Sequence, residues 1–81
     1  MDQGGLIMMQ REYTRKPSIT TLRAAAFRAV NAGETWIQFI WGENQITLEK
    51  TRWGWDGHGW IGRNGGSDLA REITRAGQTN N

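Results

Sequence analysis

The sequence predicts an α+β fold: a two-layer domain in the order helix, strand, strand, strand, helix, with two helices packed on one face of a three-stranded antiparallel meander. Three observations support this class. Residues 19–32 place apolar side chains at helical steps of three and four, residues 35–53 alternate with the period of a strand, and residues 69–76 return to helical spacing. A three-stranded meander needs a second layer to bury its apolar face, and the two helices supply that layer.

The first predicted helix spans residues 19–32. Pro17 and Ser18 precede it, and a serine at this position caps the free backbone N–H groups of a first turn. Gly33 follows it, and we expect this glycine to end the helix in a left-handed conformation. The helix places its apolar stripe at Ile19, Leu22, Ala26, Ala29 and Val30.

Two strands are predicted at residues 35–41 and 45–53, joined by a hairpin loop at residues 42–44. The first strand alternates between a face of Ile37, Phe39 and Trp41 and a face of Trp36, Gln38 and Ile40. The second strand alternates between a face of Ile46, Leu48, Lys50 and Arg52 and a face of Thr47, Glu49, Thr51 and Trp53. Residues 56–59 have the composition of a turn, and residues 60–63 form the third predicted strand.

The second predicted helix follows a turn at residues 64–67. Ser67 is its expected cap, and Asp68 lies in the first turn, where the helix dipole favours a carboxylate. Gly77 is expected to end the helix in a left-handed conformation. The predicted core combines both helices with one sheet face: Leu22, Ala26, Val30, Leu69 and Ile73 with Ile37, Phe39, Ile46, Leu48 and Ile61. The other sheet face is predicted to be open to solvent.

The length and composition of the chain limit the domain organisation. With 81 residues there is room for one domain, predicted at residues 13–77 between a flexible arm at residues 1–12 and a polar tail at residues 78–81. No apolar run approaches the roughly 20 residues that span a membrane, and the first residues lack the pattern of a signal peptide. We therefore expect a cytoplasmic protein without membrane contact.

Composition also argues against several function classes. The absence of cysteine excludes disulfides and thiolate metal sites. The formal net charge of +2 disfavours a nucleic-acid mimic and is low for a dedicated duplex-DNA binder. His58 is the single histidine, lies between two glycines and has no serine or cysteine at motif spacing. Residues 57–62 match G-x-G-x-x-G but do not open a helix. We therefore expect no enzyme activity, no cofactor and no metal.

Tryptophan is the clearest functional signal in the sequence. Five tryptophans exceed what the core of so small a chain needs, so some rings should lie on a surface and bind a partner. Together with nearby arginines and the histidine they define the candidate partner-binding residues, which are Trp36, Arg52, Trp53, Trp55, His58, Trp60 and Arg63.

These residues predict a small non-enzymatic binding module. We expect a regulator or inhibitor that binds a protein or nucleoprotein target through a Trp/Arg-rich sheet face. The alternative is a nucleic-acid-binding domain in which bases stack on tryptophan and arginines contact phosphates. An exposed apolar sheet face also fits a homodimer.

Two known families share parts of this pattern. The helix–strand–strand–strand–helix order resembles double-stranded RNA-binding domains, but residues 67–69 stand where that family has a basic cluster at the start of its last helix. Residues 53–55 and 59–62 are similar to parts of AP2-type DNA-binding domains. Neither likeness contains a matched motif, so we assign no family and transfer no site.

Overall fold

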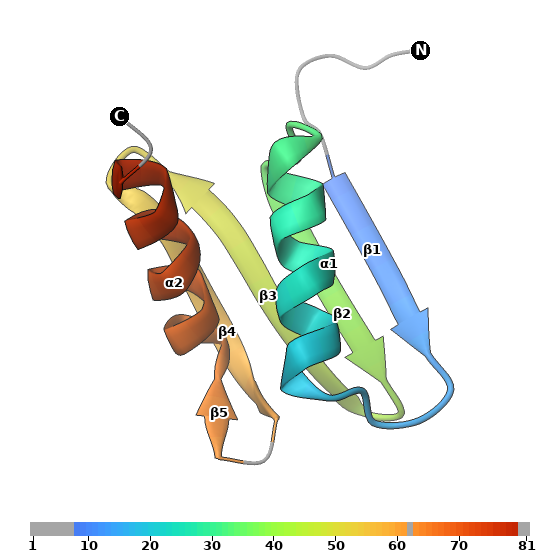
Figure 1. Cartoon of the computed structure of the whole chain (residues 1–81). Helices are drawn as coiled ribbons and strands as arrows, with labels where there is room; N and C mark the ends of the chain where they lie inside the picture. The colour runs from blue at the N-terminus through green and yellow to red at the C-terminus, as the bar shows by residue number, and fades with distance from the viewer. Residues whose placement is uncertain (1–7, 62, 80–81) are drawn as a thin grey trace, which may run out of the picture.

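In the structure, a computed structural model, residues 8–61 and 63–79 are described, and they form a mixed five-stranded sheet with two helices (Figure 1). The strands are β1 (Met8–Tyr13), β2 (Trp36–Trp41), β3 (Asn44–Thr51), β4 (Gly54–Ile61) and β5 (Asn64–Gly65). The helices are α1 (Ile19–Asn31) and α2 (Gly66–Thr79). The strands lie in chain order across the sheet; β1 is parallel to β2, and the other neighbouring pairs are antiparallel.

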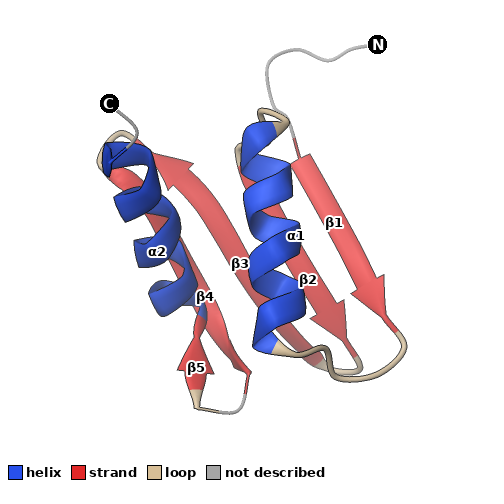
Figure 2. Cartoon of the chain, in the orientation of Figure 1, coloured by secondary structure: helices blue, strands red, loops and turns tan. Residues whose placement is uncertain are grey.

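The predicted α+β class is confirmed, and both helices cover the same face of the sheet (Figure 2). The predicted meander corresponds to β2, β3 and β4. The sheet is wider than the three strands predicted, because β1 adds at one edge and the two-residue β5 adds at the other.

The N-terminal strand corrects the predicted flexible arm. Residues 8–12, assigned to that arm, lie in β1, whereas residues 1–7 lie outside the described residues. β1 pairs with β2 along its whole length, and its residues Met9 and Tyr13 pack against the core. The sequence concealed this strand because the parallel partner is 28 residues away, so no local turn signals the pairing.

α1 and the core agree with the sequence. Ser18 Oγ accepts a hydrogen bond from the backbone N–H of Thr21 at 3.1 Å, and Gly33 follows the helix with a φ of +90°. All predicted core residues are buried except Val30, which is half-buried. Among the described residues, Phe39 is the largest fully buried side chain, and it belongs to the core between the sheet and the helices.

β3 and β4 form a longer hairpin than the sequence predicts. β3 ends at Thr51, so Arg52 and Trp53 form the turn instead of the end of a strand. Residues 56–59, predicted as a turn, lie inside β4. The glycines there permit close packing: a Cβ on Gly57 would collide with the backbone carbonyl of Gly66 at the start of α2.

The predicted third strand at residues 60–63 is partly correct. Trp60 and Ile61 are the last residues of β4, Arg63 lies in the turn before β5, and Gly62 lies outside the described residues. Asn64 and Gly65, predicted as part of a turn, pair with the end of β4 as β5.

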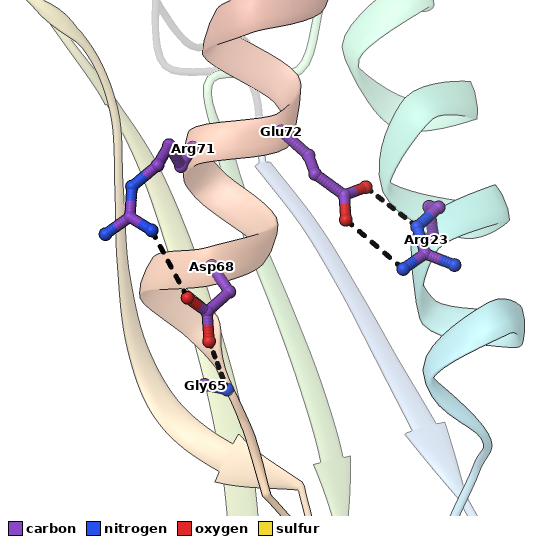
Figure 3. Close-up of polar contacts among 5 residues, drawn as sticks. All are labelled: Arg23, Gly65, Asp68, Arg71 and Glu72. Atoms are coloured by element: carbon purple, nitrogen blue, oxygen red, sulfur yellow. Dashed lines mark hydrogen bonds and ion pairs between the residues drawn. The ribbon is translucent and has the colours of Figure 1, made fainter.

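The start of α2 differs from the prediction. The helix begins at Gly66, so Ser67 lies inside it and is not the cap. Instead, Asp68 Oδ2 accepts a hydrogen bond from the backbone N–H of Gly65 at 3.1 Å, as drawn in Figure 3. This bond joins the short strand β5 to the first turn of the helix.

The end of α2 also differs. The helix continues through Gly77 to Thr79, and Gly77 does not adopt a positive φ, so the prediction that it ends the helix is wrong. The predicted polar tail is shorter as well, since residues 78–79 are helical and residues 80–81 lie outside the described part. A glycine inside a helix costs about 1 kcal/mol, and the buried side chains of Leu69 and Ile73 offset that cost.

An ion pair joins the two helices. The Arg23 guanidinium contacts both Glu72 oxygens, at 2.7 and 3.2 Å (Figure 3). The hydrogen bond from Arg23 to Glu72, together with the carboxylate charge, raises the pKa of Arg23 above its ordinary value. Because the two side chains are 41% and 44% exposed, the pair links α1 to α2 but adds little to the stability of the fold.

Candidate partner-binding site

The seven predicted site residues do not form one surface. Trp36, His58 and Trp60 lie on the sheet face away from the helices, because each belongs to the strand alternation opposite the core residues. Trp55 shares the helix side of the sheet and packs against the core as a half-buried ring. Arg63 is exposed in the turn before β5.

The open sheet face is polar instead of Trp/Arg-rich. Its described strand residues include no lysine or arginine, whereas Glu12, Glu49 and Asp56 place carboxylates on it. His58 Nε2 lies 3.7 Å from a Glu49 oxygen, and both side chains are exposed. Trp36 is half-buried. The expectation of arginines on this face is therefore wrong.

A row of amide side chains crosses the open face. Gln10 Nε2 donates to Gln38 Oε1 at 2.8 Å, and Gln38 Nε2 donates to Gln45 Oε1 at 3.0 Å and to Thr47 Oγ1 at 3.3 Å. The row follows the sheet register, in which Gln38 is paired with Gln10 on one side and Thr47 on the other. We call these four residues the glutamine ladder.

The turn of the β3–β4 hairpin presents the most exposed aromatic ring. Trp53 is 84% exposed, and the Arg52 guanidinium lies 5.7 Å from the centre of its ring. The backbone beneath is held by Thr51, whose hydroxyl accepts from the Trp53 N–H at 3.1 Å and donates to the Gly54 carbonyl at 2.9 Å. The position of the turn is thus set by hydrogen bonds, while its indole remains in solvent.

A second set of hydrogen bonds attaches this hairpin to α2. The backbone N–H of Trp55 donates to Thr74 Oγ1 at 2.8 Å, and that hydroxyl donates to the Ala70 carbonyl at 2.9 Å. Gly54 is required here, since its φ is +135° and a Cβ would lie 2.6 Å from a methyl carbon of Thr74. The hairpin is therefore attached to the C-terminal half of α2 by the hydrogen bond from Trp55 to Thr74 and by the close approach of Gly54 to Thr74.

A groove opens beside Trp53, between the C-terminal halves of the two helices. Its volume is about 430 Å³. The apolar lining consists of Phe27, Val30, Trp53, Trp55, Ile73 and Ala76. The charged lining residues are Lys50 and Arg52, and no acidic side chain among the described residues lines it. We call this surface, with the exposed Trp53 ring at its rim, the hairpin groove.

A neighbouring hollow of about 470 Å³ shares Trp53 and Trp55 and has Asp56, His58 and Arg71 in its lining. The structure therefore brings Arg52, Trp53 and Trp55 together and separates them from Trp36, Trp60 and Arg63. Sequence reasoning missed the contribution of Lys50 and Phe27 to the groove. The position of Phe27 at the border of the α1 stripe was the available signal.

The described residues contain no group of three or more His, Asp or Glu side chains that could hold a metal ion. No helix in the described part of the chain is long and apolar enough to cross a membrane. In comparisons with known proteins, no family model, no curated protein and no solved structure matches the chain.

Proposed function

We propose that this protein is a non-enzymatic, cytoplasmic binding module, a regulator or inhibitor that docks the hairpin groove onto a protein partner. The observation that carries the proposal is the exposure of Trp53 on a turn whose backbone is held in place. Tryptophan and arginine are the residue types most enriched at the energetic centres of protein interfaces, and Arg52 lies against the Trp53 ring.

The ordered backbone beneath Trp53 favours binding. Ordering a flexible loop on association costs free energy, whereas the hydrogen bonds of Thr51 and Thr74 order this hairpin in the free protein. Apolar side chains of a partner can pack against the adjoining apolar lining. The contact would also remove the exposed Trp53 indole from water, which is favourable.

The charged residues that line the hairpin groove are cationic, but the charge of the neighbouring open sheet face favours a protein partner over nucleic acid. Bases could stack on Trp53 with Arg52 on a phosphate, but a strand laid along the open sheet face would meet the carboxylates of Glu49 and Asp56. Self-association through that face is also disfavoured, since amide and carboxylate side chains occupy much of it.

The experiment compares Trp53→Ala with Trp60→Ala in affinity capture from the native host, followed by nuclease treatment. Trp60 is 67% exposed and lies at the other end of β4, about 23 Å away by strand geometry, so it is a matched control for loss of a surface indole. We expect a nuclease-resistant protein partner that Trp60→Ala retains and Trp53→Ala loses. Equal capture by both variants would refute the hairpin groove as the contact surface.

Titration of a fluorescent single-stranded oligonucleotide tests the alternative function. Electrostatic binding to nucleic acid weakens steeply as salt increases, whereas a contact centred on Trp53 and apolar side chains changes little. Salt-sensitive oligonucleotide binding that Trp53→Ala abolishes would replace the protein partner by nucleic acid at the same site.

A further inference from the structure

The two edges of the sheet differ in whether another element covers them. At one edge, β4 is covered: β5 pairs with its last residues, and α2 accepts a hydrogen bond from the Trp55 N–H through Thr74. At the other edge, β1 pairs with β2 on one side, and in the described part of the chain no strand lies on its outer side. An uncovered edge strand is a template for pairing with another chain.

The glutamine ladder ends at this uncovered edge. Each amide donates toward the centre of the sheet, from Gln10 to Gln38 and from Gln38 to Gln45. Gln10 is exposed, and its carbonyl oxygen is not used in donating to Gln38. The open edge therefore carries an amide group with both a donor and an acceptor, and such a group is complementary to itself.

We propose that a second copy of this chain pairs with β1 in antiparallel orientation, with the two-fold axis at Gln10. Gln10 then lies opposite Gln10 of the partner subunit, and the two glutamine ladders join through a reciprocal pair of amide hydrogen bonds. The product is a continuous ten-stranded sheet with all four helices on one face.

Parity, charge and the self-complementary Gln10 amide together select the register. Directly opposite residues of a pair share a sheet face, so a two-fold axis perpendicular to the sheet must pass through a residue position and not between two positions. An axis at Arg11 or at Glu12 would place like charges directly opposite each other, which is destabilising. An axis at Gln10 pairs Arg11 with Met9 and Glu12 with Met8 of the partner subunit, without like charges opposite each other.

Such an interface is small. Pairing of five residues falls below the roughly 1,200 Å² of total buried surface in standard interfaces, so we expect a reversible dimer that depends on concentration. The inference is independent of the hairpin groove, which lies at the other side of the sheet beside β4 and stays accessible in the dimer.

The pairing can be tested with two variants that place a positive or a negative charge at the two-fold axis. Sedimentation velocity over a concentration series measures how strongly each variant dimerises. Gln10→Lys and Gln10→Glu each place like charges across the two-fold axis, and we expect each to weaken the dimer at least about tenfold. An equimolar mixture of the two variants should restore the dimer as a heterodimer. A wild-type chain that stays monomeric, variants that dimerise normally, or a mixture that stays monomeric would each overturn the proposal.

Disulfide trapping gives the register directly, because the chain has no cysteine of its own. Opposite residues of an antiparallel pair have Cβ atoms about 4.5–5.5 Å apart, near the range that a disulfide spans. Under mild oxidation Gln10→Cys should form a covalent dimer. Glu43→Cys, exposed in the β2–β3 turn, is the matched control and should remain monomeric. Equal crosslinking of both variants would indicate random collision and contradict the proposed axis.

Discussion

The two helices cover the same sheet by different means. α1 packs through side chains, and its buried Leu22, Ala26 and Ala29 meet the apolar face of β2. α2 approaches β4 so closely at its start that Gly57 and Gly66 bring backbone against backbone. One helix layer is thus specified by the apolar periodicity of α1 and by the glycines that let α2 approach β4.

Phe39→Ala should have the largest effect, and it measures how much stability the packing of side chains between sheet and helices provides. The ring is fully buried beneath the helix layer, so its removal leaves a cavity. We expect a loss of about 4 kcal/mol in the free energy of unfolding, and Leu22→Ala should cost about 2–5 kcal/mol. Urea denaturation followed by circular dichroism measures both values. A loss below about 1 kcal/mol in both variants would contradict this core.

Gly57→Val should have the next largest effect, and it measures how much stability the close backbone approach of α2 to β4 provides. Its side chain would meet the Gly66 carbonyl, and backbone cannot move aside as a flexible side chain can. We expect a loss of about 3 kcal/mol or displacement of α2 from the sheet. Thermal melting and amide exchange in α2 report the two outcomes. Unchanged stability and exchange would show that α2 does not depend on this contact.

Thr74→Val separates the hydrogen bond from the packing at the β4 edge. The substitution keeps the shape of the side chain and removes the oxygen that accepts from the Trp55 N–H. We expect a loss of about 1–2 kcal/mol, since the amide lies beside a helix and loses its partner. Thr20→Val, on the exposed surface of α1, is the matched control. Equal losses in both variants would assign the effect to helix propensity instead.

Gly77→Ala should have the smallest effect, in the opposite direction. Gly77 lies inside α2 without a positive φ, and a Cβ there would meet nothing within 4 Å. Alanine is the better helix former, so we expect a gain of about 0.5–1 kcal/mol in the free energy of unfolding. A destabilised variant would indicate that the helix does end at this glycine in solution.

The difference between the helices also explains what the sequence predicts and what it conceals. Apolar spacing and the Ser18 cap predict α1, and strict alternation predicts β2 with its buried Phe39. In β4 the helix-facing positions include Gly57, so the alternation vanishes and residues 56–59 resemble a turn. Glycine used for close approach and glycine used for turning look alike in a single sequence.

The candidate site was predicted in residue type but not in position. Arg52, Trp53 and Trp55 were selected for their chemistry, and they line the hairpin groove. Trp53 does not lie on a sheet face because β3 ends two residues earlier than its pattern suggests, and Trp55 lies in β4 on the helix side of the sheet. Lys50 lines the groove because of the way the hairpin and both helices pack together. Such tertiary packing cannot be predicted from local residue spacing.

The parallel pairing of β1 with β2 has a consequence for the order of folding. The β2–β3 and β3–β4 hairpins join neighbouring segments across short turns, whereas β1 must wait for α1 and β2 and close a loop of 28 residues. Loop closure over longer separations is slower and entropically costlier. Of the strands in the sheet, β1 is therefore synthesised first but is expected to join last, along the edge of β2.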